Sequence, residues 1–367
     1  MSLKLISLIL FISLIVLLLI TLLSHREYFE NGNKEITPKL KRPFVNLYDD
    51  KGNALNVYLI SKPFRNKDEY KIYEDNKDKN VFLGICSYLE FPNKPSNPFE
   101  NFDQNYKDFK YKEICEGWIH GFRDPENYFP PQTPLLFASE SDWTDCNVSK
   151  PIPNEPKIYD FIYICLKADE KKSLCDDWAT YNKNWKLAKK CLDVFCNEYK
   201  LKGLLIGRKG CELPNGCKHM DSTNMLKYHE LQKMYSKCKF IFVPNEKDAS
   251  PRVLTEALAS NIACLVNRNI LGGWKYVNDK TGELFTDEKD LPAALDKLLY
   301  GLSNNKYEPR KYFVNNYSVE NSGKRLKEFL YKHWGDRITI PKSQVKFISP
   351  EFVKKNFKTC GSAINSN

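Results

Sequence analysis

Short, unbroken apolar runs alternate with amphipathic segments over the second half of the chain, and this rhythm constrains the fold more than any other feature. Between about Lys157 and Leu302 the apolar runs are Phe161–Leu166, Leu204–Gly207, Phe240–Val243 and Ala263–Val266. The segments with apolar residues at helical spacing are Asn184–Tyr199, Asn224–Ser236 and Pro251–Ala259. Runs that are apolar on both faces are typical of parallel strands covered by helices on both sides. The pattern therefore predicts a doubly wound α/β domain, in which a ligand binds at the carboxyl ends of the strands.

The first region, from about Pro43 to Pro156, is less regular. We expect its elements to be strands at Ala54–Ile60, Val81–Tyr88 and Leu135–Ser139 and a helix around Tyr111–Phe122. The stretch Pro151–Pro156 holds three prolines in six residues, which is typical of a linker because proline disfavours helix and central strand. We therefore predict a Rossmann-like domain over 43–156, a second domain over 157–335 and an irregular tail over 336–367. The second domain is expected to close with two helices, Leu291–Tyr300 and Val319–Trp334.

The N-terminus carries a long apolar run, Leu5–Leu23, with 19 residues and no charge. As a helix it would cover ~28 Å, close to the thickness of the hydrocarbon core of a bilayer. A cleaved signal peptide is the alternative, but its apolar region is shorter, about 7–15 residues, and ends in a small-x-small site. We therefore predict one transmembrane helix, an uncleaved anchor over 1–24, followed by a polar tether over 25–42.

The side of the membrane on which the rest of the chain lies stays open at this point. Lys4 is the only charged side chain before the apolar run, whereas five cations follow it: Arg26, Lys34, Lys39, Lys41 and Arg42. This bias, together with twelve scattered cysteines, favours a cytosolic soluble domain on a single-pass membrane protein. Two glycosylation sequons would matter only in a lumen, and two are expected by chance in a chain this rich in Asn: Asn147-Val148-Ser149 and Asn316-Tyr317-Ser318. A lumenal orientation is the alternative.

Composition excludes several classes of protein. Of 367 residues, 42% are hydrophobic and 28% are charged, which are proportions of globular domains and not of disordered or multi-spanning chains. The net charge of +10 is spread along the chain, and the aromatic residues of the first region have no basic stripe beside them. We therefore expect no nucleic acid as a partner. A basic protein also suits a phosphate-bearing small substrate or an anionic membrane face.

The most informative stretch is Phe240–Ser260. After a strand and a polar loop, Ser250 is expected to cap a helix that has Pro251 at its first position. The free N–H groups and the dipole of such a helix bind phosphate without a metal. Asp248 before the helix and Glu256 inside it can each accept hydrogen bonds from two neighbouring hydroxyls of a ribose or a hexose. An ordinary capped helix with a solvent-facing glutamate explains this stretch equally well.

Asp248 and Glu256, with seven residues between them, resemble the paired-acid motif of the GT-B glycosyltransferases of the group 1, or family 4, type. The motif reads Asp248-Ala249-Ser250-Pro251-Arg252-Val253-Leu254-Thr255-Glu256-Ala257-Leu258-Ala259. Three later blocks are similar to the family's continuation, in the same order: Ile270-Leu271-Gly272-Gly273, Thr281-Gly282-Glu283-Leu284-Phe285 and Tyr317-Ser318-Val319-Glu320. The resemblance covers roughly 160–334, nearly half of the chain. It implies a GT-B fold, with two Rossmann-like domains facing a cleft, the first for the acceptor and the second for a nucleotide-sugar.

The resemblance also implies roles for particular residues. Glu256 would bind the ribose of the nucleotide and Asp248 would face the donor sugar, and the two would form the catalytic pair. The donor pocket would be lined by the backbone of Ala249, Ser250 and Pro251 and by Gly272 and Gly273. Two cations would neutralise the leaving diphosphate. Lys167 is a candidate for the first, Lys183 or Lys186 for the second, and Arg208 is a further alternative. Nothing in this stretch supplies the Asp-x-Asp of metal-dependent transferases, so we expect transfer without a metal.

Three further residues are candidates for contact with the sugars. His120 is in the first region, and the family often uses a histidine of its first domain near the donor sugar. Glu140 and Asp142 follow an apolar run, and polar residues at strand ends face the cleft in this fold, so they are candidates for the acceptor or donor-sugar site. A weaker possibility is zinc at three clustered residues that have no fourth ligand at a matching spacing: Cys211, Cys217 and His219.

The predicted function is that of a membrane-anchored glycosyltransferase that moves a sugar from a UDP- or GDP-sugar to a glycan, lipid or protein acceptor, with retention and without a cofactor. Three features depart from the family. The first acid is an aspartate, the glycine-rich turn is replaced by Ala249-Ser250-Pro251, and the first region carries no acceptor signature. The alternative is a catalytically silent GT-B-like protein that binds a glycan or holds a partner at a membrane. An unrelated nucleotide-binding α/β protein is disfavoured because no P-loop or GxGxxG is found here.

Overall fold

The structure is a computed structural model that describes residues 40, 43–48, 54–87, 89–93, 109–165, 175 and 178–338. All of these belong to one compact unit, Leu40–Asn367. The predicted anchor over 1–24 lies outside the described residues, as do nearly all of the tether and the tail from 339 onward. Within the described ranges, no helix is both long and apolar enough to cross a membrane.

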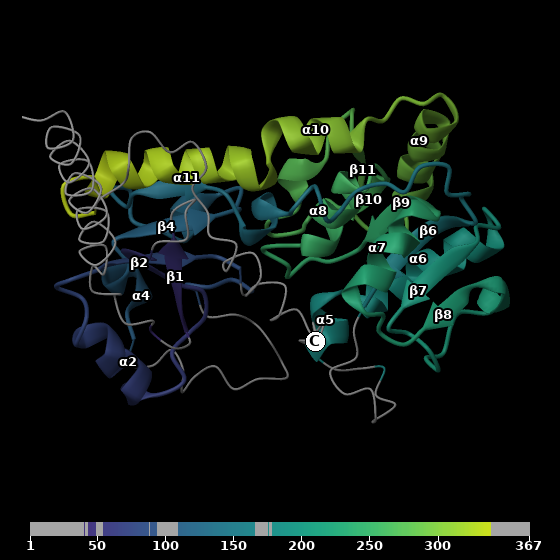
Figure 1. Cartoon of the computed structure of the whole chain (residues 1–367). Helices are drawn as coiled ribbons and strands as arrows, with labels where there is room; N and C mark the ends of the chain where they lie inside the picture. Colours follow the sequence, from purple (N-terminus) through teal and green to yellow (C-terminus); the bar gives the residue numbers. More distant parts are fainter. Residues whose placement is uncertain are drawn as a thin grey trace, which may run out of the picture. The chain divides into compact units, whose positions relative to one another are not determined.

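Two sheets organise the described residues (Figure 1). The first, sheet A, has the order β1-β2-β3-β4-β5, and only β1 is antiparallel to its neighbour. Its strands are Phe44–Tyr48, Ala54–Ile60, Val81–Ile85, Gly117–His120 and Leu135–Phe137. The second, sheet B, has the order β11-β10-β9-β6-β7-β8 and is parallel throughout. Its strands in chain order are Tyr159–Ile164, Gly203–Ile206, Asp221–Thr223, Cys238–Val243, Ala263–Asn267 and Gly282–Phe285.

Helices cover both faces of sheet B. The α-helices among the described residues are α2 (Lys67–Glu74), α4 (Tyr111–Ile114), α5 (Trp178–Asn182), α6 (Trp185–Asn197), α7 (Tyr228–Ser236), α8 (Arg252–Ala259), α9 (Leu291–Ser303), α10 (Pro309–Asn316) and α11 (Ser318–Trp334). Phe240 and Phe242 share a buried cluster with residues of α6 and α9, whereas Ile241 and Val243 share one with residues of α7 and α8. Alternate residues of one strand thus face different helical layers, which confirms the predicted doubly wound arrangement.

The last helix belongs to the other sheet. Four residues of α11 at helical spacing are buried in one cluster with the strands of sheet A: Leu326, Phe329, Leu330 and Trp334. Figure 1 shows α11, in yellow, lying along β4. The helix was expected to close the second domain, because its periodicity identifies an apolar face and not the sheet that covers it.

The segment expected to be a helix, Tyr111–Phe122, is not one. It forms the four-residue α4 and then the strand β4, whose four residues are all buried. Gly117 begins this strand, and a Cβ there would lie 2.7 Å from the Trp334 ring and 3.0 Å from the carbonyl of Pro134. Close packing of α11 on the sheet therefore requires a glycine at this position. Strand β1 and helix α2 were not expected at all.

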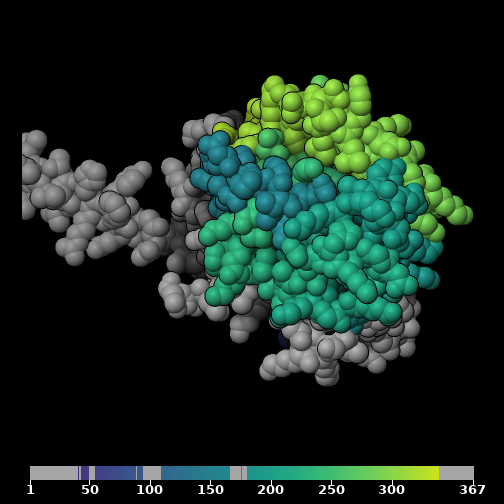
Figure 2. All heavy atoms as spheres, turned by 90° about the vertical axis from the view of Figure 1, so that its right-hand side faces the viewer, coloured from purple at the N-terminus to yellow at the C-terminus, as the bar shows by residue number. Residues whose placement is uncertain are grey.

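The link between the two sheets, residues 138–158 between β5 and β6, lies against α10. The guanidinium of Arg310 donates to the carbonyl oxygens of Cys146 at 2.9 Å and Ser149 at 3.0 Å, and also to that of Ala259. In Figure 2 the blue link is seen beside the yellow-green C-terminal helices. One arginine thus joins the link, α8 and α10.

Four cysteines form two disulfides, Cys175–Cys211 and Cys196–Cys217. The zinc alternative is therefore wrong, because two of its three ligands are consumed and Nε2 of His219 lies 2.9 Å from the carbonyl oxygen of Leu201. Across the described part of the chain, no group of residues could hold a metal ion. Since disulfides persist in oxidising compartments, these pairs weigh against the reducing space that the number of cysteines favoured.

Candidate active site

Asp248 lies in the turn between β9 and α8, at the carboxyl edge of sheet B. Its Oδ2 accepts hydrogen bonds from Nζ of Lys183 at 2.5 Å and from Nδ2 of Asn245 at 2.8 Å. Its Oδ1 accepts from the backbone N–H of Ser250 at 3.2 Å. The structure therefore brings together two residues that the sequence analysis assigned to the donor, Asp248 and Lys183, and adds Asn245.

Lys183 is positioned by the residue that follows it. Asn184 has φ 51°, in the left-handed region that asparagine tolerates better than most residues. Its side-chain oxygen accepts from the N–H of Leu187 and so caps α6, while its Nδ2 donates to the carbonyl oxygen of Pro244 and to Glu246. The start of α6 is thus fixed to the turn that carries Asp248. Sequence reasoning missed this role of Asn184, although an asparagine directly before an amphipathic helix is a capping signal.

Glu256 lies inside α8 and is only 5% exposed. Its Oε2 accepts a hydrogen bond from the hydroxyl of Tyr235 at 3.0 Å. Burial raises the pKa of Glu256 to about 7, and this rise is opposed by the Tyr235 hydrogen bond and by the charges of Arg252 and Lys183. Near neutral pH this carboxyl group is poised between its two protonation states, so hydroxyl donors from a ligand would favour its ionised form.

The cap expected for α8 is not formed. Pro251 occupies the N-cap position and no side chain bonds the first turn. The hydroxyl of Ser250 instead contacts the backbone N–H of Ser141 at 3.0 Å and the Ser141 hydroxyl at 2.8 Å. Ser141 belongs to the 3₁₀ turn Glu140–Trp143, which follows the last strand of sheet A. The expectation was wrong because a partner 109 residues away in sequence takes the hydroxyl.

The Gly272-Gly273 loop packs against the Asp248 turn. The N–H of Gly272 donates to the carbonyl oxygen of Asp248 at 3.1 Å, and a Cβ at Gly272 would lie 1.9 Å from the carbonyl oxygen of Ala249. From sheet A, Gly121 also reaches this point, and a Cβ there would lie 3.3 Å from Cα of Gly272. Three backbone segments therefore meet around Ala249, and a side chain at Gly272 would separate them.

His120 ends β4, next to Gly121, and its side chain is almost fully buried. Its ring packs among three aromatic rings, those of Phe122, Phe129 and Phe137. Burial lowers the pKa of His120 to about 4, and the charge of Lys275 adds to the effect. His120 is therefore neutral at physiological pH, with hydrogen-bond capacity and no charge.

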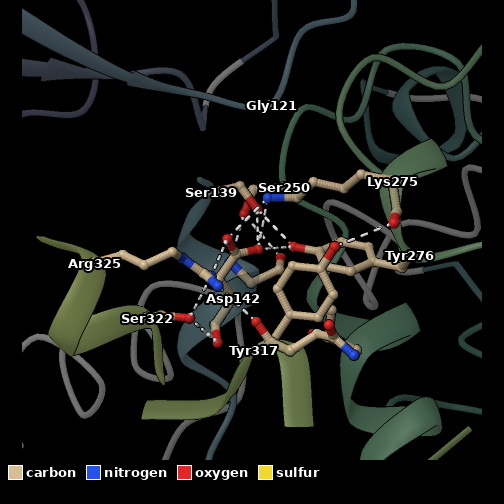
Figure 3. Close-up of polar contacts among 12 residues, drawn as sticks. Gly121, Ser139, Asp142, Ser250, Lys275, Tyr276, Tyr317, Ser322 and Arg325 are labelled. Atoms are coloured by element: carbon tan, nitrogen blue, oxygen red, sulfur yellow. Dashed lines mark hydrogen bonds and ion pairs between the residues drawn. The ribbon is translucent and has the colours of Figure 1, made fainter. Parts of the chain in front are cut away.

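Asp142 lies in the interior, where its carboxylate is already paired (Figure 3). Nζ of Lys275 lies 2.7 and 2.9 Å from its two oxygens, the hydroxyl of Tyr276 donates to it, and Arg325 lies 3.6 Å away. Its carbonyl oxygen accepts from the hydroxyl of Ser322. The group therefore joins the 3₁₀ turn after sheet A to the η4 turn (Trp274–Tyr276) of the second region and to α11. With no exposed surface, Asp142 cannot contact an acceptor in this arrangement, in contrast to the expectation, while Glu140 stays a prediction.

Arg208 is also an interior residue. Its Nε donates to the carbonyl oxygens of Cys165 at 3.0 Å and Gly207 at 2.9 Å, and its guanidinium lies 5.3 Å from the centre of the Trp185 ring. Arg208 therefore links the carboxyl ends of β6 and β7. Strand β6 is the neighbour of β9, which leads into the turn at Asp248. Lys167, the other predicted cation, lies outside the described residues.

Comparisons of sequence and of structure give different results. No family model matches the chain, and no curated protein matches its sequence. The crystal structure of a glycosyltransferase from Rickettsia africae ESF-5 is similar, with 13% identity and a TM-score of 0.51, over 74% of this chain and 76% of its own. Anabaena Alr3699/HepE in complex with UDP-glucose is 10% identical with a TM-score of 0.51, over 75% of this chain and 79% of its own. TarM is 14% identical with a TM-score of 0.51, over 74% of this chain and 54% of its own, so this chain spans about half the length of TarM.

At these identities the likeness concerns the fold. The chain has an α/β fold with two largely parallel sheets, and this fold matches that of GT-B glycosyltransferases. The fold predicted from the sequence is therefore confirmed. The family 4 type and the membrane anchor stay predictions, as do the roles of the site residues.

Proposed function

We propose that this protein is a glycosyltransferase that uses a nucleotide-sugar donor. The observation that carries the proposal is the group at the carboxyl edge of sheet B, where Asp248, Lys183 and the Gly272 loop meet and Glu256 lies inside the adjacent helix. Solved structures with this fold include one in complex with UDP-glucose. The site thus combines carboxylates for sugar and ribose hydroxyls with a cation for phosphate, in the place where α/β sheets bind ligands.

In the reaction we propose, an acceptor oxygen forms a bond to the anomeric carbon of the donor sugar with retention of configuration, as the family 4 resemblance implies. The bond between that carbon and the diphosphate oxygen breaks, and the nucleoside diphosphate leaves with the electron pair and takes up the proton of the acceptor hydroxyl. Lys183 and the N-terminus of α8 stabilise the leaving anion, and Lys167 is proposed to assist. Glu256 holds the ribose, Asp248 holds the sugar hydroxyls, and neutral His120 contacts the sugar from sheet A.

This mechanism needs no metal, and we propose that the diphosphate is neutralised by lysines and backbone amides alone. The acceptor is a glycan, a lipid or a protein. A catalytically silent binding protein is the second candidate, and one observation favours it. Asp248 is already bonded to Lys183 and Asn245, and Ala249 is 1% exposed against the aromatic cluster of sheet A, so a donor must displace existing contacts.

A donor screen separates the two candidates. The full chain in detergent is incubated with UDP- and GDP-sugars, and release of UDP or GDP is measured for the native chain and for Asp248→Asn. We expect release from one donor and its loss in the variant, with UDP or GDP binding retained. Binding without release for every donor and a glycan acceptor would favour the silent protein.

We also propose that Leu5–Leu23 anchors the chain in a membrane, on the charge and length of that segment alone. Extraction of membranes at high pH tests the proposal, because a spanning chain stays in the pellet and a peripheral one is released. The side is decided separately in a eukaryotic cell. The asparagines of both sequons, Asn147 and Asn316, are exposed, so a lumenal domain would lose mass on treatment with an endoglycosidase.

A further inference from the structure

A small cavity lies beside the candidate active site, at the junction of the two sheets. Its volume is about 210 Å³, and its walls come from the loops that follow β4 and β10. The lining residues are Phe122, Arg123, Asp124, Tyr128, Arg268, Asn269, Ile270 and Leu271.

 We call this space the junction cavity. Arg268 also lines a larger cavity of about 400 Å³ beside the edge strand β11.

The junction cavity adjoins the turn that carries Asp248. The N–H of Leu271, in its wall, donates to the carbonyl oxygen of Glu246 at 3.0 Å, and the N–H of the next residue, Gly272, donates to that of Asp248. On the opposite wall, Phe122 follows Gly121, which touches Gly272. A ligand in this cavity would therefore lie next to the proposed donor-sugar site, on the side of the first sheet.

Two arginines give the cavity its charge. The guanidinium of Arg123 donates to the carbonyl oxygen of Arg268 at 2.7 Å and lies 4.8 Å from the centre of the Trp274 ring. Neither Arg123 nor Arg268 makes an ion pair with a carboxylate within the described ranges, although Asp124 and Asp290 lie close enough to act on them. Burial and the neighbouring charge of Arg268 lower the pKa of Arg123. Two arginines and one carboxylate, that of Asp124, therefore line one small space, and its net positive charge favours an anion there.

An aromatic wall completes the cavity. The rings of Phe122 and Tyr128 stack with their centres 3.8 Å apart and their planes 14° from parallel. Phe122 is buried, and Tyr128, which stacks on it, is half-buried. Aromatic walls with a few placed polar groups are typical of small-molecule sites. The volume is below the ~300–1,000 Å³ of pockets for drug-sized ligands, so the cavity suits one sugar unit and not a whole nucleotide-sugar.

We propose that this cavity binds the acceptor through an anionic group, and that the acceptor is a phosphorylated or carboxylated sugar whose anion lies between Arg123 and Arg268. This inference rests on the proposed function and adds the chemical class of the acceptor. The alternative is that the same arginines bind the diphosphate of the donor. The experiment distinguishes an anionic acceptor from the donor diphosphate.

The test measures binding to the full chain in detergent by titration calorimetry, with four probes: glucose 6-phosphate, glucuronate, methyl glucoside and UDP. The variants are Arg123→Gln, Arg268→Gln and the control Lys189→Gln, which removes an exposed cation of α6. We expect an anionic sugar to bind at least tenfold more tightly than methyl glucoside. Each arginine variant should lose that preference, whereas the control should keep it and the affinity for UDP should not change.

Three results would overturn the inference. These are equal binding of anionic and neutral sugars by the native chain, equal loss in the Lys189→Gln control, or a loss of UDP affinity in the arginine variants, which would assign the arginines to the donor. Thermal melting of each variant confirms that it is folded. Failure of the proposed function has a different signature, because a chain that is not a transferase releases no UDP or GDP from any donor even where an anionic sugar binds.

Discussion

Two aspartate–lysine pairs, Asp142 with Lys275 and Asp248 with Lys183, have different surroundings. In one, Lys275 and Asp142 are 2% and 0% exposed and are enclosed by tyrosines from two regions of the chain. In the other, Lys183 and Asp248 are 20% and 9% exposed and lie at the carboxyl edge of a sheet. The chemistry of the two pairs is the same. Their burial separates a pair that joins elements from one that a ligand can reach.

The largest effect is expected from the enclosed pair. Lys275→Met should lower the free energy of unfolding by about 3–5 kcal/mol, because it leaves the Asp142 charge buried and without its main partner. Urea unfolding measures this loss. The double variant Lys275→Met with Asp142→Leu removes both charges and should lose less than the single variant. A double variant that is the less stable of the two would contradict this view of the pair.

The Lys183–Asp248 pair at the sheet edge should affect the reaction more than the fold. Lys183→Ala should slow donor turnover by ~30- to 1000-fold, or ~2–4 kcal/mol of barrier, because the leaving diphosphate loses a preorganised cation. Its loss of stability should be smaller than that of Lys275→Met, because the pair is closer to solvent. Initial rates and urea unfolding of the same samples check both statements. Lys189→Ala, at an exposed position on α6, is the control and should change neither.

The sequence predicts the position of one aspartate–lysine pair better than that of the other. The turn at Asp248 follows a strand and precedes a helix, so its place at the edge of sheet B follows from local periodicity. Lys183 was predicted near the diphosphate from the family resemblance, and the structure puts it against Asp248. Asp142 is also a polar residue after a strand, and the rule that such residues face the cleft predicted that it contacts a sugar. The rule failed there because its partner Lys275 is 133 residues away, and no local pattern shows which strand ends are covered.

Other differences have the same physical origin. The apolar stripe of α11 predicts a helix but does not show which sheet the helix packs against. The hydroxyl of Ser250 could cap its own helix or bond a distant residue, and it contacts Ser141. The strand Gly117–His120 was expected to be helical because a run of four residues is too short to distinguish the two periods. In each case the outcome depends on contacts between residues that are far apart in the chain, and local sequence patterns do not show such contacts.

The buried carboxyl of Glu256 predicts a pH dependence. Because hydroxyl donors favour its ionised form, the affinity for UDP should rise with pH between about 6 and 8, by at most tenfold per unit, and level off above its pKa of about 7. The stability of the fold changes with pH in the opposite direction. Between 4.5 and 7 the folded chain keeps a proton that the unfolded chain has lost, so the contribution of Glu256 to stability falls as pH rises. Titrations of UDP at several pH values measure the first effect, and Glu256→Gln should remove it.

Removal of metal should have the smallest effect. The described ranges hold no group that could bind a cation, and the site offers lysines and amides for the diphosphate. We therefore expect donor turnover to persist in EDTA at an unchanged rate. Turnover that is abolished by EDTA and restored by manganese would contradict the proposed mechanism.

The central claim is that Glu256 and Asp248 form a nucleotide-sugar site, and binding of UDP and GDP to Glu256→Ala tests it most directly. We expect the native chain to bind one of the two nucleotides and the variant to bind it ~2–4 kcal/mol more weakly, because two charge-assisted hydrogen bonds to the ribose are lost. The variant should unfold at nearly the same urea concentration. Equal affinity in the two chains, or no binding of either nucleotide by the native chain, would contradict the account.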